Sequence, residues 1–170
     1  MNKKTALFVG RFQPFHLGHL SVIREIEQDE SIEEILVGIG SAQEANTPKN
    51  PFSFNERQEI IQKVLEKEVK KPFQIFAIQD VGSDGKWFKL VEFLAPYPFQ
   101  VIYTNNDWVE SIYKSRGIEV IKPKTVIITS ATIIRGLIRE DKKWDYLVHG
   151  EVKNMLEKLS GIERIKNLPE

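Results

Sequence analysis

Two histidines three residues apart lie in the segment of this chain that is best suited to chemistry. Residues 10–19 are GRFQPFHLGH, which places His16 and His19 on one face at the start of a helix. Gly10 lets the backbone approach a ligand closely, and a helix amino terminus offers N–H groups to phosphate. With Arg11 nearby, the segment predicts a compact cluster of donors for an anion.

The histidines have two other interpretations. They could be ordinary surface or core residues, although two of the three histidines in the chain lie in this one turn. They could also bind a metal ion, but no Asp, Glu or Cys nearby completes a ligand set. We therefore favour a phosphate site and expect no metal held by protein side chains.

A second segment with hydroxyl groups lies late in the chain. Residues 129–135 are TSATIIR, where an apolar run at 126–128, interpreted as a strand, ends and a helix begins. Taken alone, Thr129 or Ser130 could be only the N-cap that any helix needs. Arg135 follows one turn into that helix. Together the two segments resemble the two ends of one polyphosphate site.

The hydrophobic pattern predicts the elements that position these segments. Apolar runs at 5–9 and 35–40, each ended by glycine, are typical of buried parallel strands. Further strands are predicted at 73–78, 99–103 and 118–121. Helical spacing of apolar residues predicts helices at 17–28, 54–71, 87–94, 108–115, 132–139 and within 144–159.

This alternation predicts an α/β fold, a Rossmann-like doubly wound parallel sheet with short C-terminal helices. Ligands of such sheets bind beyond the carboxyl ends of the strands. Both segments described above lie at such ends. The length of 170 residues suits a single domain spanning 1–170.

Composition narrows the classes of function. The 24 Lys and Arg balance the 24 Asp and Glu, and no basic stripe stands out, so nucleic acid is not expected as a partner. The absence of cysteine excludes disulfides and cysteine nucleophiles. No apolar run reaches membrane-spanning length and no signal peptide is evident. We expect a cytoplasmic protein with no membrane partner.

The two segments resemble the HxGH and I-S-x-T-x-x-R signatures of a nucleotidyltransferase superfamily. More narrowly, GSAQ at 40–43, NPF at 50–52 and GIERI at 161–165 are similar to the archaeal-type nicotinamide-nucleotide adenylyltransferases. The resemblance implies the nucleotidyltransferase type of the α/β fold. It also implies an enzyme that transfers AMP from ATP to nicotinamide mononucleotide (NMN), giving NAD and pyrophosphate.

For ATP, the resemblance implies that His16 and His19 hold the phosphates and stabilise charge on the α-phosphoryl group. Arg11 and Arg135 would grip the polyphosphate, and Lys49 would add a mobile positive charge; these five are the implied catalytic residues. The full implied ATP site is Gly10, Arg11, Phe12, His16, Gly18, His19, Asn105, Thr129, Ser130, Thr132 and Arg135. Mg²⁺ is expected as cofactor, held mainly by phosphate oxygens and water.

For NMN, the resemblance implies that Trp87 stacks on the nicotinamide ring, although a tryptophan in an amphipathic helix is more often a core residue. The GSDG turn at 82–85 suggests an exposed loop just before it. The rest of the implied NMN site is Gly40, Ser41, Asp80, Val81 and Arg57. The family also implies a symmetric homo-oligomer, commonly a hexamer.

The chain departs from the family pattern at three places. Lys49 replaces an arginine, YTNNDW at 103–108 replaces a Ser-Gly-Asn-Pro type loop, and Thr129 replaces an aliphatic or aromatic residue. Two alternatives stay open. One is transfer to another acceptor, such as nicotinate mononucleotide, phosphopantetheine or FMN; the other is a nucleotide sensor without turnover, against which the intact Arg11 and His16 argue.

Overall fold

Five parallel strands form the centre of the protein, as described by a computed structural model for residues 3–124 and 127–169. The strands are β1 (Lys4–Gly10), β2 (Ile32–Ile39), β3 (Phe73–Ala77), β4 (Val101–Tyr103) and β5 (Glu119–Ile121). Their order in the sheet is β3-β2-β1-β4-β5. The chain therefore winds outward from β1 in both directions, and the strand order reverses between β1 and β4, where ligands of such sheets bind.

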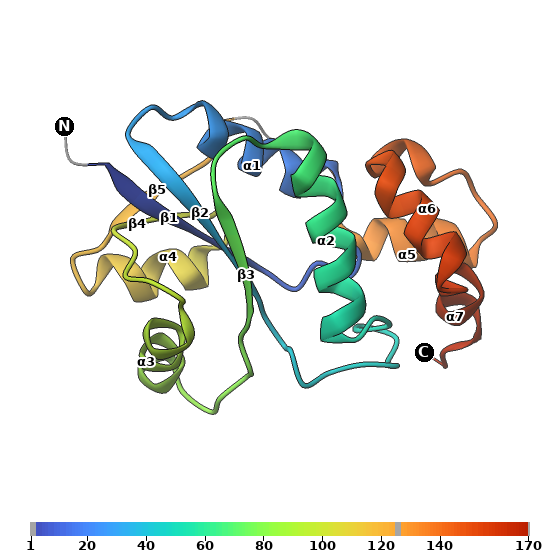
Figure 1. Ribbon diagram of the computed structural model, residues 1–170. Helices are drawn as coiled ribbons and strands as arrows, with labels where there is room; N and C mark the ends of the chain where they lie inside the picture. The colour runs from blue at the N-terminus through green and yellow to red at the C-terminus, as the bar shows by residue number, and fades with distance from the viewer. Residues whose placement is uncertain (1–2, 125–126, 170) are drawn as a thin grey trace.

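Helices cover both faces of this sheet (Figure 1). On one face lie α1 (Leu17–Gln28) and α2 (Phe54–Glu68); on the other lie α3 (Asp84–Leu94) and α4 (Asp107–Lys114). After β5 the chain continues into α5 (Ala131–Arg139), the 3-10 turn η1 (Asp145–Leu147), α6 (Gly150–Lys158) and α7 (Gly161–Asn167). These C-terminal helices pack against α2 and one another, which extends the first layer beyond the sheet.

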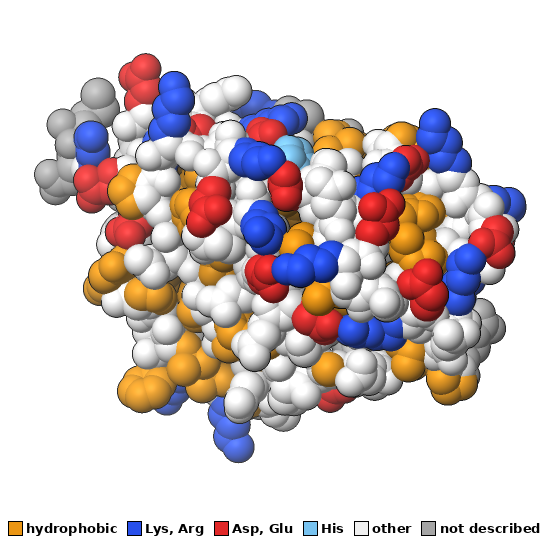
Figure 2. All heavy atoms as spheres, turned by 45° about the vertical axis from the view of Figure 1, so that its right-hand side comes forward, with side chains coloured by type: hydrophobic (Ala, Val, Ile, Leu, Met, Phe, Trp, Pro, Cys, Tyr) orange, Lys and Arg blue, Asp and Glu red, His pale blue; other side chains and the backbone are white. Residues whose placement is uncertain are grey.

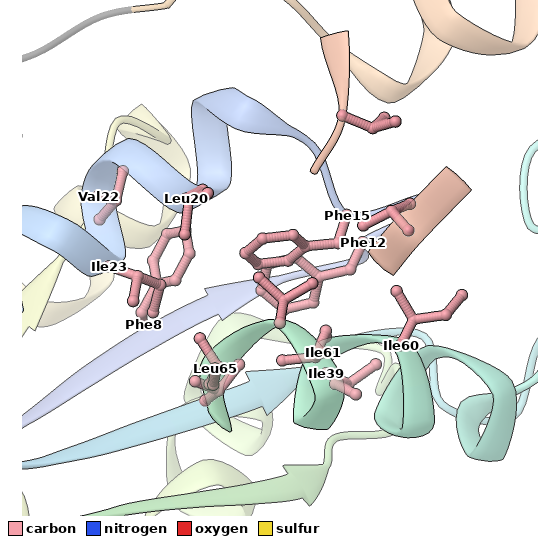
Figure 3. Packing of buried hydrophobic residues seen from close by; sticks show 14 of the residues in the cluster. Phe8, Phe12, Phe15, Leu20, Val22, Ile23, Ile39, Ile60, Ile61 and Leu65 are labelled. Carbon is pink, nitrogen blue, oxygen red and sulfur yellow. The ribbon is translucent and has the colours of Figure 1, made fainter. Parts of the chain in front are cut away.

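Alternate residues of β1 belong to two separate cores. Ala6 and Phe8 pack with α1, α2 and the C-terminal helices, whereas Leu7 packs with α3 and α4. Figure 3 shows that Phe12 and Phe15, from the turn after β1, point into the first core toward α2. Because both rings are almost fully buried, the turn that carries the predicted phosphate site is anchored to the core.

Ion pairs contribute to the contact between α2 and α6. Lys67 pairs with Glu151, and Lys158 approaches Glu59 at 3.5 Å. On the face shown in Figure 2, positive and negative side chains are interspersed. Exposed pairs of this kind contribute at most about 1 kcal/mol each, so apolar burial carries most of the stability of this contact. Among the described residues, no helix is long and apolar enough to cross a membrane.

The structure confirms the predicted doubly wound α/β sheet. The predicted strand at 126–128 is the exception: Val126 lies outside the described residues, and Ile127 and Ile128 belong to no strand. Ile128 is 90% exposed, because neither it nor Ile127 pairs with a neighbouring strand that would bury it. Helix α7 was not predicted, since seven residues are too few for a helical period to stand out.

Two buried tyrosines provide a test of this packing. The Tyr113 hydroxyl has no hydrogen-bond partner among the described residues, whereas the Tyr103 hydroxyl donates to Asp29 Oδ2 over 2.6 Å. An unpaired buried hydroxyl costs about 1–3 kcal/mol, and a hydrogen bond to a charged group contributes about 1.5–3 kcal/mol. We expect Tyr113→Phe to keep or raise the free energy of unfolding, and Tyr103→Phe to lower it by about 2 kcal/mol. Urea unfolding measures both, and a larger loss in Tyr113→Phe would contradict this account.

Candidate active site

Glycine avoids close contacts at the end of β1 and in the first turn of α1. Phe12 has a φ of 52°, and its ring occupies the space beside Gly10, where a Cβ would lie 2.7 Å from Phe12 Cε1. A Cβ at Gly18 would lie 3.1 Å from the His16 ring. The two glycines therefore let the aromatic ring fold back under β1 and let His16 lie over the start of α1.

His16 and His19 cap the amino terminus of α1 reciprocally. The backbone N–H of His19 donates to His16 Nδ1 over 3.3 Å, and the backbone N–H of His16 donates to His19 Nδ1 over 3.2 Å. The two rings stack with their centroids 3.6 Å apart. Because each Nδ1 accepts a hydrogen bond, the proton of each neutral ring lies on Nε2. The cap thus leaves one N–H per ring to donate to an anion.

Burial keeps both imidazoles neutral. His16 is only 7% exposed, and this burial lowers the pKa of its imidazole from 6.5 to about 4. Burial and then the neighbouring His16 lower the pKa of His19 as well. At neutral pH the histidines therefore act as neutral hydrogen-bond donors, and the positive charge of the site comes from other side chains.

Arg11, Lys49 and Arg135 supply that positive charge. With the two histidines they line a pocket of 220 Å³. Arg135 is 8% exposed and donates through Nη1 to the carbonyl of Gln13 over 2.8 Å, while its Nε has no partner among the described residues. Burial, followed by nearby Arg139 and Arg11, lowers the pKa of Arg135. A bound anion would relieve this crowding of like charges.

A larger pocket of 550 Å³ adjoins the first one and shares Arg11, His16, His19 and Ser130 with it. It is lined by residues of β1 and of the loops after β4 and β5, namely Gly10, Thr104, Asn105, Asn106 and Thr129, and by Gly18. The N-cap residues of α1, α4 and α5 all lie in its wall. Three helix amino termini with their positive dipole ends therefore meet at one cavity, which suits an anionic nucleotide.

The hydroxyl residues at the start of α5 have distinct roles. Ser130 Oγ accepts from the backbone N–H of Ile133 over 3.1 Å, so its own O–H can donate to a ligand. Thr132 Oγ1 lies 3.4 Å from Arg135 Nη2 and lines the smaller pocket. From the sequence alone, Ser130 was either an N-cap or a ligand-binding residue. The structure allows both, because its oxygen caps the helix while its O–H is left to donate.

The residues predicted for NMN are not among the residues that line these two pockets. The N–H of Gly40 donates to the carbonyl of Gly10 over 2.9 Å, so the loop after β2 runs alongside the turn after β1. Ser41 follows with a φ of 47°. Asp80 pairs with Gln43 through its carboxylate and its backbone N–H, at 3.0 and 3.1 Å. Val81 next to it is 38% exposed.

Arg57 is buried beneath these loops, with 1% of its surface exposed. Its guanidinium donates to the carbonyls of Arg11 and Gly40, each over 2.8 Å, and to that of Ser41 over 3.1 Å. Burial lowers its pKa to about 10, which leaves it charged at neutral pH. In the structure Arg57 therefore ties the loops after β1 and β2 together, and its predicted contact with NMN stays a prediction.

Trp87 lies in the core between α3 and α4. It is 5% exposed, and its ring centroid lies 4.9 Å from that of Trp108. Trp108 is 44% exposed, and its indole N–H donates to Asp84 Oδ1 over 3.0 Å, which holds it against the start of α3. Stacking of a pyridine ring on Trp87 would therefore need neighbouring side chains to move, and this contact also stays a prediction.

Sequence reasoning missed three polar residues that line the pockets, Gln13, Thr104 and Asn106. Thr104 Oγ1 accepts from the N–H of Asn106, whose side chain caps α4. The signal for these two was the polar run after a buried strand, from which only Asn105 was selected. The signal for Gln13 was a single polar side chain between aromatic residues of the turn.

Comparisons with known proteins agree with this fold. The family model described as Cytidylyltransferase-like matches residues 7–165, so the chain belongs to that family. A protein of Methanococcus aeolicus is 40% identical over 165 residues, which cover 96% of this chain and 94% of the relative. That relative is named nicotinamide-nucleotide adenylyltransferase, and at this similarity the chain falls within the same group of the family.

Solved structures show the same fold at lower identity. A bifunctional NMN adenylyltransferase/ADP ribose pyrophosphatase from Francisella tularensis superimposes with a TM-score of 0.82 at 24% identity. The match covers 98% of this chain, which spans about half (52%) of that one. A nicotinic acid mononucleotide adenylyltransferase from Plasmodium falciparum gives a TM-score of 0.69 at 14% identity, covering 95% and 98% of the two chains. At these identities the likeness shows the fold alone.

The low pKa of His16 makes stability depend on pH. The pKa of His16 is about 4 in the folded protein and 6.5 in the unfolded chain. Between these two pH values the unfolded chain binds more protons than the folded protein does. The contribution of His16 to stability is therefore present above this window and is lost as the pH falls through it. His16→Asn removes the titrating ring and keeps a good N-cap residue. From pH 7 to pH 5 we expect the wild type to lose about 2 kcal/mol more unfolding free energy than the variant. Urea unfolding at both pH values tests this, and equal losses would contradict it.

Proposed function

We propose that this chain is an adenylyltransferase that joins the phosphate of NMN to the α-phosphate of ATP, giving NAD and pyrophosphate. The observation that carries the proposal is the cluster of His16, His19, Arg11 and Arg135 at the strand-order reversal, in a chain that is 40% identical to a nicotinamide-nucleotide adenylyltransferase. The NMN phosphate is already an anion at neutral pH. It can attack phosphorus without a general base, so positioning and charge stabilisation are enough.

In the proposed reaction, an NMN phosphate oxygen forms a bond to the α-phosphorus of ATP. The bond from that phosphorus to the bridging oxygen breaks, and the electron pair leaves with pyrophosphate. His16 and His19 donate through Nε2–H to the phosphate chain. Arg11, Arg135 and Lys49 balance its charge in the 220 Å³ pocket, and the amino terminus of α5 adds backbone donors.

The two pockets suggest how ATP is oriented. The 550 Å³ pocket, with Gly10, Gly18, Asn105 and Thr129 in its wall, is proposed to take the adenosine. The smaller pocket, with Phe12, Ser130 and Thr132, is proposed to take the phosphates. NMN would then approach along the loops that contain Gly40, Ser41, Asp80 and Val81, with Trp87 behind them. The direct hydrogen bond between Gly40 and Gly10 supports this arrangement, since it sets the two loops side by side.

Mg²⁺ is proposed to enter with ATP. The described residues that line the two pockets include no carboxylate, and residues 3–124 and 127–169 contain no group of three or more side chains placed to hold a metal ion. This donor set fits an ion that phosphate oxygens and water coordinate. Its chemistry would be to neutralise the leaving pyrophosphate.

A substrate panel tests the proposed function. We expect pyrophosphate release from ATP and Mg²⁺ with NMN, in step with NAD formation. In His19→Ala the rate should fall by about 10²- to 10³-fold, because one donor to the charge that develops in the transition state is lost. Parallel reactions with nicotinate mononucleotide, phosphopantetheine and FMN measure the choice of acceptor.

The other outcomes of that panel are distinct. Turnover with a different acceptor alone would keep the phosphate roles and contradict the NMN assignment. Binding of ATP without turnover for any acceptor would favour a nucleotide sensor. A His19→Ala variant as active as the wild type would remove His19 from the reaction.

Removal of the metal gives a separate test. With excess EDTA we expect turnover to fall by about 100-fold or more, because the leaving pyrophosphate loses its counter-ion. The melting temperature of the substrate-free protein should not change, since the proposed ion is held by ATP. Added Mg²⁺ should restore the rate. Turnover that survives chelation, or a protein that melts earlier in EDTA, would contradict this proposal.

Nucleotide substrates follow from the family, whereas assembly and location remain predictions. A hexamer and a cytoplasmic location rest on the family resemblance and on the sequence.

A further inference from the structure

Gln13 is a buried polar residue that the proposed chemistry does not use. It is 2% exposed, and its side-chain amide pairs with both backbone groups of Phe52, 39 residues away. Nε2 donates to the Phe52 carbonyl over 2.8 Å, and Oε1 accepts from the Phe52 N–H over 2.9 Å. The carbonyl of Gln13 itself accepts from Arg135. One residue therefore joins the turn after β1, the helix α5 and the loop before α2.

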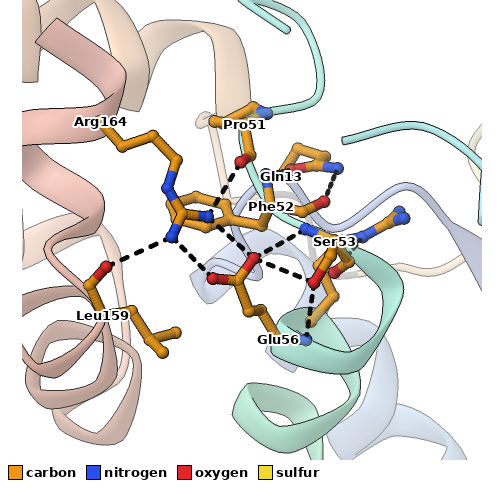
Figure 4. Close-up of polar contacts among 8 residues, drawn as sticks. Gln13, Pro51, Phe52, Ser53, Glu56, Leu159 and Arg164 are labelled. Carbon is orange, nitrogen blue, oxygen red and sulfur yellow. Dashed lines mark hydrogen bonds and ion pairs between the residues drawn. The ribbon is translucent and has the colours of Figure 1, made fainter. Parts of the chain in front are cut away.

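The same loop is held from its other side by α7 (Figure 4). Arg164 donates to the Pro51 carbonyl over 3.2 Å and pairs with Glu56 over 2.8 Å, and its guanidinium lies 5.6 Å from the centre of the Phe52 ring. Glu56 accepts from the backbone N–H of Ser53 over 2.8 Å. Residues 51–53 are thus clamped between the turn after β1 and the C-terminal helix.

Lys49 lies two residues before this clamped segment. Thr47 and Asn50 on either side of it exchange backbone hydrogen bonds of 3.2 and 3.1 Å, which makes a tight turn. Lys49 itself is exposed and lines the 220 Å³ pocket opposite the histidines. A long exposed side chain has little packing to orient it, so the place of its charge depends on the backbone that carries it.

We propose that Gln13 is a positioning residue for nucleotidyl transfer, which sets the separation between the turn of His16 and the loop of Lys49. Both then meet the same phosphate chain. The inference rests on the proposed function of this site. An amide is required because one side chain must donate and accept at the same time; a carboxylate would only accept, and a thioether would do neither with comparable strength.

Gln13→Met tests this role against a control with a similar pattern of amide hydrogen bonds, Gln100→Met, although Gln100 is exposed and Gln13 is buried. Gln100 also uses both amide atoms on the backbone, accepting from the Thr5 N–H over 2.9 Å and donating to the Pro98 carbonyl over 3.4 Å. It lies at the opposite, amino end of β1. Below the melting temperature of both variants, we expect kcat/KM for ATP to fall about 10- to 100-fold in Gln13→Met and to stay unchanged in Gln100→Met. Equal effects in the two variants would overturn the positioning role.

A double-mutant cycle with Lys49→Ala tests the route of the effect. If Gln13 acts by placing Lys49, the double variant should be little worse than the more damaged single variant. If the two losses multiply, Gln13 does not act through Lys49 and the proposal fails.

Two measurements do not depend on turnover. Hydrogen exchange at the Phe52 amide should accelerate in Gln13→Met, and calorimetry should show weaker binding of ATP than in the wild type. A wild type that binds ATP but makes no NAD would contradict the proposed function and leave this comparison valid. Equal ATP affinity in the wild type and in Gln13→Met would overturn the inference in either case.

Discussion

The reciprocal cap that His16 and His19 form on α1 is the interaction on which the site depends. It satisfies two backbone N–H groups at a buried helix start, and it fixes the tautomer of both rings in the same contacts. The His16 ring lies against Gly18, where a Cβ would come within 3.1 Å of it, and the cap follows a turn anchored by Phe12 and Phe15. The same turn therefore starts the helix, packs against the core and presents the hydrogen-bond donors to a ligand. A substitution that disturbs one of these contacts also disturbs the others.

Positive charge is arranged around this neutral pair by buried hydrogen bonds. Arg57 donates to three carbonyls of the loops after β1 and β2, whereas Arg135 lines the 220 Å³ pocket and donates to one such carbonyl, that of Gln13. Arg57 thus holds the loops around the site together, whereas Arg135 lines the pocket itself. Burial, followed by nearby Arg139 and Arg11, lowers the pKa of Arg135, and a bound anion would offset the repulsion among these arginines. This bias favours polyphosphate over neutral ligands.

The C-terminal helices add support that the sheet alone does not supply. Arg164 of α7 and Glu56 of α2 fix the loop that leads to Lys49, and Gln13 fixes it from the opposite side. In this way a segment more than a hundred residues from the histidines contributes to their geometry. Active sites of this type need rigid placement, because charge stabilisation in the transition state weakens quickly when donors move.

By itself the sequence determined the sheet, most helix positions and the histidine turn, because strand runs, helical spacing and a glycine-rich turn are local patterns. It did not determine that Arg57 would face backbone carbonyls, that Trp87 would lie under Trp108, or that Ile127 and Ile128 would remain outside the sheet. Only the tertiary structure decided these features. Burial and pairing depend on residues distant in the chain, and no local period encodes which buried side chain meets which carbonyl.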